Sequence, residues 1–171
     1  MSGKKRSHDT GGNMFRTVRN KKNEISAEDA KRLLACERRG VLAMNGEDGY
    51  PYAVPVNYRY LEKENRIIFH GSYAGYKSEM IAKNGKVCFT VYGNVRVKDE
   101  AWAPYVQSAV VFGSCRRVED REETLALLRT FAGKYYPDEA AMEEEIARSG
   151  RAAAMYVIDI EHLSGKEVQE R

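Results

Sequence analysis

The chain has 171 residues, of which 43% are hydrophobic, and it carries a formal net charge of +3 at pH 7. This length suits one domain with a real core, since domains of about 150 residues bury roughly 70% of their unfolded surface. No apolar run approaches the roughly 18 residues of a membrane span. Three widely separated cysteines argue against a disulfide framework and favour a reduced, cytoplasmic protein.

The positive charge is concentrated at the N-terminus. Residues 1–24 hold seven basic and two acidic side chains, whereas the remaining 147 residues hold 21 basic and 23 acidic ones. A nucleic-acid-binding domain would carry a basic stripe on its folded body, so we expect no nucleic acid as partner. Residues 1–13 are predicted to form a disordered leader, and residues 14–171 a single domain.

Helix signals open this domain. Ser26 and Asp29 resemble a capping box, apolar residues follow at helical spacing, and Gly40 predicts the end of the helix. Residues 41–45 then predict a short apolar strand, and residues 46–50 a turn.

An alternating segment follows at residues 50–61, which predicts a strand with one buried face. Pro55 lies inside this strand. Because proline cannot donate to a strand ladder, it indicates either an edge strand or a bulge, and a bulge would free main-chain groups to meet a planar ring. The apolar face comprises Tyr52, Val54, Val56, Tyr58 and Tyr60.

The rest of the chain predicts a small antiparallel barrel with flanking helices. About six strands come as hairpins and meanders, without strict βαβ alternation and without a repeat. The further strands are expected at residues 66–70, 86–92, 107–118 and 152–160, and the further helices at residues 75–85, 120–135 and 137–150.

The segment IIFHGSYAGYKSEMI, residues 67–81, joins a strand to a helix. Small residues follow His70, and Lys77 lies on the first helical turn. Free backbone N–H groups and the helix dipole favour an anion at such a junction, so the segment is compatible with a phosphate site. A solvated lysine is the alternative at this stage.

Other catalytic classes lack their motifs. His8 lies in the leader, and His70 and His162 are 92 residues apart with no neighbouring His/Cys/Asp cluster at ligand spacing, so no metal site is expected. The sequence contains no GxGxxG, phosphate-binding P-loop, GxSxG or HExxH motif.

Several separated segments, in order, resemble the flavin-binding split-barrel family related to pyridoxamine 5′-phosphate oxidase, and most closely its 5-nitroimidazole-reductase (Nim-like) branch. The resemblance runs from about Arg16 to Lys166 and implies an antiparallel split barrel that binds FMN. It also implies a homodimer with the flavin sites at the subunit interface. The segments are GVLAMNGEDGYPYAVPVNYRY, IIFHGSYAGYKSEMI, KVCFTVYG, SAVVFGSCRRVED and IDIEHLSGKE.

The resemblance also implies site residues. The segment after the "VP" of this family runs beside the flavin ring, the "HG" faces the flavin, and the lysine binds the phosphate. A serine touches the cofactor, and an aromatic residue of an irregular loop reaches the partner's flavin. Carried over to this sequence, these are Val54, Pro55, Val56 and Asn57, then His70, Gly71 and Ser72, then Lys77, and finally Ser108 and Trp102.

The implied activity is that of an FMN-dependent oxidoreductase that reduces nitroaromatic or similar small molecules. His70 is the candidate catalytic residue, as a proton donor to the acceptor, with a purely structural histidine as the alternative. A flavin- or haem-binding protein without efficient turnover is a second reading. A pyridoxamine 5′-phosphate oxidase is a third, disfavoured because the chain lacks the arginine-rich phosphate site and the C-terminal substrate-binding segment of those enzymes.

Overall fold

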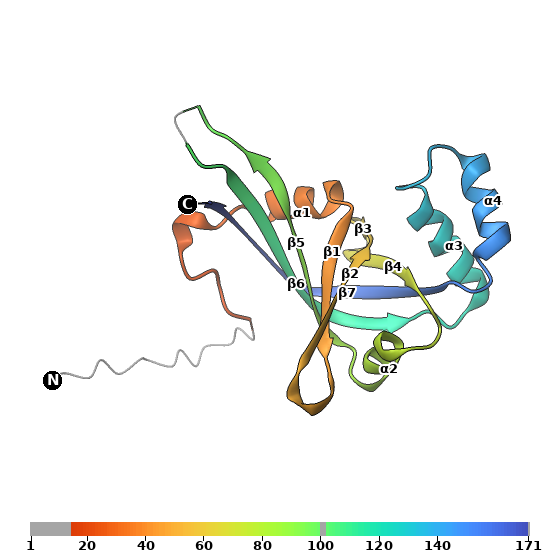
Figure 1. Ribbon diagram of the computed structural model, residues 1–171. Helices are drawn as coiled ribbons and strands as arrows, with labels where there is room; N and C mark the ends of the chain where they lie inside the picture. Colours follow the sequence, from red (N-terminus) through yellow and green to blue (C-terminus); the bar gives the residue numbers. More distant parts are fainter. Residues whose placement is uncertain (1–14, 100–101, 171) are drawn as a thin grey trace.

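Seven antiparallel strands form one curled sheet in the order β2-β1-β5-β6-β7-β4-β3 (Figure 1). The computed structural model describes residues 15–99 and 102–170, so the predicted leader over residues 1–13 lies outside the described residues. The strands are β1 (Arg39–Asn45), β2 (Pro51–Asn57), β3 (Arg59–Leu61), β4 (Arg66–Gly71), β5 (Lys86–Arg96), β6 (Tyr105–Arg117) and β7 (Ala154–Gln169).

Four α-helices flank the sheet, so the predicted antiparallel split barrel with flanking helices is confirmed, with seven strands in place of about six. Within the described ranges, no helix is both long and apolar enough to cross a membrane. The helices are α1 (Ala27–Cys36), α2 (Tyr76–Lys83), α3 (Arg121–Ala132) and α4 (Glu139–Ser149), and two 3₁₀ turns are η1 (Lys21–Asn23) and η2 (Glu47–Gly49).

Side-chain caps fix where the helices begin. The Ser26 hydroxyl accepts a hydrogen bond from the Asp29 N–H at 3.0 Å, as the predicted capping box requires. At the start of α3, the Asp120 carboxylate accepts a hydrogen bond from the N–H of Glu123 at 2.7 Å. Each cap satisfies an N–H group that has no partner within its own helix.

The prediction that Gly40 ends the first helix is wrong. Helix α1 already ends at Cys36, where Glu37 adopts an extended backbone, and Gly40 lies inside β1. A Cβ atom at Gly40 would collide with the ring of Phe89 on the neighbouring strand. Glycine is therefore needed here for close packing and not for a helix C-terminus.

This contact predicts a stability effect. Gly40→Ala should lower the free energy of unfolding by about 1–3 kcal/mol, because the added methyl group has no room beside Phe89. Urea denaturation of the single variants and of Gly40→Ala/Phe89→Leu would measure it. A smaller side chain at position 89 should relieve part of the loss, whereas strictly additive effects would show that this contact is not the cause.

Two apolar clusters hold the layers together. The larger one fills the concave side of the sheet, where Leu34 of α1 and Met80 of α2 pack among strand residues such as Phe89. The smaller one lies between the sheet and the α3–α4 pair and includes Ile68 and Phe131. Figure 1 shows α3 and α4 side by side at the end of the sheet where β4 and β7 meet.

The outward side of β2, β1, β5 and β6 carries an apolar surface that we name the open face. One cross-strand row of this face runs from Pro55 through Val41 and Thr90 to Val110. Its side chains are exposed or half-buried, whereas the residues that alternate with them are buried in β1, β5 and β6 and half-buried in β2. The open face comprises Ala53, Pro55, Val41, Ala43, Cys88, Thr90, Tyr92, Ser108, Val110 and Phe112.

Candidate functional site

The site begins where β4 ends and the chain turns into α2. The hydroxyl of Tyr156 donates a hydrogen bond to the Ser72 carbonyl at 2.7 Å, and the Ser72 hydroxyl accepts one from the N–H of Ala74 at 3.3 Å. Gly75, with a φ of 105°, precedes the first residue of α2. Most residues avoid this positive φ, so glycine permits the sharp entry into the helix.

Lys77 projects from this first helical turn back to the end of β4. A Cβ atom built on Gly71 would lie 2.9 Å from the Lys77 Nζ, so any side chain at position 71 would displace the ammonium group. The ammonium group lies 5.5 Å from the ring centroid of Phe69 and 5.8 Å from that of Tyr156. Burial among these groups lowers the pKa of Lys77.

This arrangement fits a phosphate group. Among the described residues no carboxylate forms an ion pair with Lys77, and the N-terminus of α2 has no side-chain cap. A half-buried ammonium beside uncapped helix N–H groups is the combination that stabilises an anion.

His70 points to the other side of β4, toward α3. Its ring centroid lies 4.9 Å from that of Phe131, and the ring borders a cavity of about 290 Å³ between the sheet and the α3–α4 pair. Burial lowers the pKa of His70 below its ordinary value of 6.5, and the positive charge of Lys77 contributes a smaller effect in the same direction. In either protonation state the imidazole can donate a hydrogen bond through a ring N–H.

Strand β2 supplies the neighbouring wall. It forms one edge of the sheet and pairs with β1 without a register shift, so Pro55 lies on an edge strand, and the alternative of a bulge is wrong. Val54 and Val56 pack inward against the large cluster, whereas Asn57 borders the same cavity as His70. The unpaired side of an edge strand leaves backbone groups free for a ligand.

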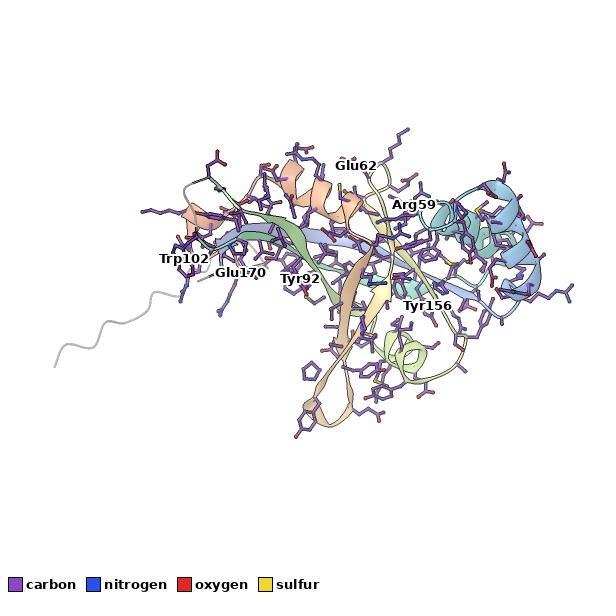
Figure 2. The ribbon with its side chains drawn as sticks, turned by 45° about the horizontal axis from the view of Figure 1, so that its top comes forward. Arg59, Glu62, Tyr92, Trp102, Tyr156 and Glu170 are labelled. Carbon is purple, nitrogen blue, oxygen red and sulfur yellow. The ribbon has the colours of Figure 1, made fainter. Side chains whose placement is uncertain are left out.

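Two of the predicted site residues lie away from His70 within the chain. Arg117 of β6 pairs with Tyr156, the neighbour of the β7 residue that pairs with His70. Ser108 is nine residues before Arg117, which corresponds to about 30 Å along the strand, although it shares the open face with Pro55. Trp102 is 81% exposed, and Figure 2 shows it at the opposite end of the sheet from Tyr156. One chain therefore does not bring all the predicted residues into one cluster.

The structure also adds residues that the sequence reasoning missed. Tyr135 borders the cavity, and its hydroxyl bridges the carbonyl of Arg38 at 2.7 Å and the N–H of Tyr58 at 2.9 Å. Arg39 lies opposite Asn57 across the β1–β2 ladder. The adjacent arginines in "CERRG" were a signal for a cationic site, but the sequence could not place them beside the cavity.

The described part of the chain contains no candidate metal site. No group of three or more His, Cys, Asp or Glu side chains is placed to hold a metal ion within residues 15–99 and 102–170. The ring of His70 lies against Phe131, and Asn57 is another residue of the cavity wall.

Comparison with known families agrees with the fold. The family model for pyridoxamine 5′-phosphate oxidase matches residues 26–167, which covers all four helices and the whole sheet except the last two residues of β7. The chain belongs to the pyridoxamine 5′-phosphate oxidase family. The family predicted from the sequence is thereby confirmed. Among curated proteins no significant match is found.

Solved structures of this pyridoxamine 5′-phosphate oxidase family fold resemble the chain over most of its length. A candidate 5-nitroimidazole antibiotic resistance protein from Bacteroides thetaiotaomicron has a TM-score of 0.72 at 19% identity, covering 96% of this chain and 97% of that one. A FAD-binding protein from Mesorhizobium loti has a TM-score of 0.60 at 23% identity, covering 85% and 96%. A FAD and haem binding protein from Mycobacterium smegmatis has a TM-score of 0.64 at 20% identity, covering 85% and 72%. At these identities the likeness shows the shared fold.

Proposed function

We propose that this member of the pyridoxamine 5′-phosphate oxidase family binds FMN and reduces nitroaromatic or similar small molecules. The observation that carries the proposal is the placement of the Lys77 ammonium, which pairs with no described carboxylate, against Gly71, one residue from His70. Support also comes from the structural relatives, whose descriptions name FAD binding and 5-nitroimidazole resistance.

The residues divide into an anchor and a reaction side. Lys77 and the free N–H groups at the start of α2 would hold the cofactor phosphate. Pro55 and Asn57, on the exposed side of the β2 edge, would border the flavin ring, with Val54 and Val56 fixing the strand from within. The two sides meet at the end of β4.

Bound FMN in its reduced form supplies two electrons and two protons, which convert a nitro group to a nitroso group and water. The chain's own contribution is to orient the acceptor, to shield it from solvent and to supply a hydrogen-bond donor at the His70 imidazole. Phe131 supports this role because it holds one face of the imidazole ring.

Cofactor identity tests the proposal directly. Denaturing the purified protein and separating the released cofactor by chromatography should give one FMN per chain. The absorption spectrum of the intact protein should show flavin bands without a haem Soret band. FAD, a deazaflavin or haem at full occupancy in place of FMN would overturn the assignment. FMN without nitro reduction would instead identify a binding protein.

We further propose a homodimer in which the open face is covered by a second copy. An uncovered surface of this kind, with Val41 40%, Tyr92 72% and Phe112 38% exposed, is typical of a protein–protein interface. Because Ser108 belongs to this face, a second subunit would also bring the distant group of predicted residues to a cofactor site. Such an interface should bury on the order of 2,000 Å² or more.

The dimer predicts a measurable mass. Light scattering at micromolar concentration should give about twice the 19.4 kDa of one chain. Val41→Glu should shift the mass toward one chain, because a carboxylate in the centre of the open face is costly to bury. Tyr136→Glu, at a side chain that lies outside this face, serves as the control. A monomeric wild type that retains FMN would contradict the proposal.

A further inference from the structure

Four basic side chains gather beside the cavity that His70 borders. None of them forms an ion pair with any described carboxylate. They come from the α1–β1 connection, the first residue of β1, the first residue of β3 and the turn after α3, and they are Arg38, Arg39, Arg59 and Lys134.

The two neighbouring arginines reach the cavity from different directions. Arg39 lies opposite Asn57 across the β1–β2 ladder. Both residues are on the outward side of their strands, since each is exposed next to an inward residue, Gly40 in β1 and Val56 in β2. The guanidinium carbon of Arg38 lies 4.8 Å from the ring centroid of Tyr135. Asn57 and Tyr135 both line the cavity, so each of the two arginines neighbours a lining residue although neither is part of the lining itself.

The other two cations are tied to the backbone. Arg59, labelled in Figure 2, donates a hydrogen bond to the carbonyl of Thr130 near the end of α3. Lys134 donates one to the carbonyl of Glu37. Burial, together with the charges of Arg59 and Arg38, lowers the pKa of Lys134 to about 8. Both contacts stabilise helix ends but neutralise no charge, so the cluster stays strongly positive.

The nearest acids are engaged elsewhere. The Glu37 carboxylate accepts a hydrogen bond from the N–H of Asn94 at 3.3 Å, on the side of the β5–β6 hairpin. Glu145, in the cavity wall, accepts one from the Ser149 hydroxyl at 2.6 Å and is paired with Arg148. The positive charge of the arginine pair is therefore available to a ligand.

The interior of the cavity has a different character. Phe131, Leu128 and Ile146 give it apolar walls, while His70 and Asn57 stand at the strand ends. A volume of about 290 Å³ suits a ligand of one ring and a few substituents. Apolar walls with a cationic rim match a planar body that carries one anionic group.

We propose that this cavity binds the electron acceptor and that Arg38 and Arg39 bind an anionic group on it, so the preferred substrates are small aromatic acids. The inference rests on the proposed function only in placing the reacting group beside His70. It goes beyond that function because a nitro compound without a negative charge would leave the arginine pair unused.

A matched pair of ligands tests the proposal. Calorimetry with the purified full-length protein should show that 4-nitrobenzoate binds about ten-fold or more tightly than the neutral 4-nitrobenzamide, because one charge-assisted contact distinguishes them. Arg38→Gln and Arg39→Gln should each remove most of this preference. Lys63→Gln, which deletes an exposed positive charge in the β3–β4 turn, should preserve it.

The outcomes separate this inference from the proposed function. Tight binding of 4-nitrobenzoate without its reduction by the reduced protein would retain the anion site and overturn the reductase activity. Equal binding and equal reduction of the two compounds would overturn the anion site alone. Arginine variants that bind 4-nitrobenzoate normally but lose the dimer would assign the pair to the subunit interface and also overturn the inference.

Discussion

Replacing His70 with alanine should slow the reduction of a 5-nitroimidazole by about 10²–10⁴-fold, the usual contribution of a positioned acid or base. His70 is the titratable group that joins the cavity to the end of β4, and Lys77 holds the phosphate separately, so FMN should stay bound. Single-turnover kinetics would measure this step: anaerobically reduced protein is mixed with the nitroimidazole, and the loss of the nitro chromophore is followed.

The pH dependence of the same step separates a proton donor from a structural histidine. Burial and Lys77 lower the pKa of His70, so the protonated form is lost as the pH rises through that lowered value. Wild-type rates should fall over this range, and His70→Ala should lack the fall. His162→Ala, a histidine on β7 that stacks on Phe15, is the control. A loss below about threefold would assign His70 to a structural role.

Lys77→Ala should weaken FMN binding by about one to two orders of magnitude, since a charge-assisted contact to phosphate contributes roughly 1.5–3 kcal/mol. Riboflavin lacks the phosphate and should lose much less affinity. Fluorescence titration of the cofactor-free protein with both ligands would measure the difference. Lys83→Ala, at the other end of α2 and paired with Glu47, removes the same charge and should leave both affinities unchanged.

Two results would contradict this assignment. Equal losses for FMN and riboflavin would show that Lys77 supports the fold of the β4–α2 junction and not the phosphate. An FMN affinity that does not fall as the pH rises through the lowered pKa of Lys77 would show that its charge is not used, because only the ammonium form attracts the phosphate.

Local patterns in the sequence predicted the elements well, because the signals are local. The Ser26 and Asp120 caps act over three residues, and both helices begin where these side chains accept hydrogen bonds. The alternation at residues 50–61 also gave the correct buried face. The alternation did not predict that the strand breaks at Tyr58. The N–H of Tyr58 donates a hydrogen bond to the Tyr135 hydroxyl, whereas in a continuous strand it would pair elsewhere.

Other features depend on contacts between distant residues. Gly40 was predicted as a helix end because its neighbour across the sheet, Phe89, is 49 residues away in the sequence. The arginine pair is adjacent in the sequence, but its position beside the cavity depends on Tyr135, which is 97 residues from Arg38 in the sequence. The roles implied for Ser108 and Trp102 require a second subunit and stay predictions.

The strand order has a consequence for synthesis on the ribosome. β2 and β3 are consecutive in the sequence, yet they form the two opposite edges of the sheet, joined through Tyr58. β3 pairs with β4, and β4 pairs in turn with β7. A nascent chain that does not yet include β7 can form the β2-β1-β5-β6 portion but cannot place the segment that follows Tyr58. The barrel should therefore close only after β7 has left the ribosome, and truncations that remove β7 should leave an exposed, aggregation-prone intermediate.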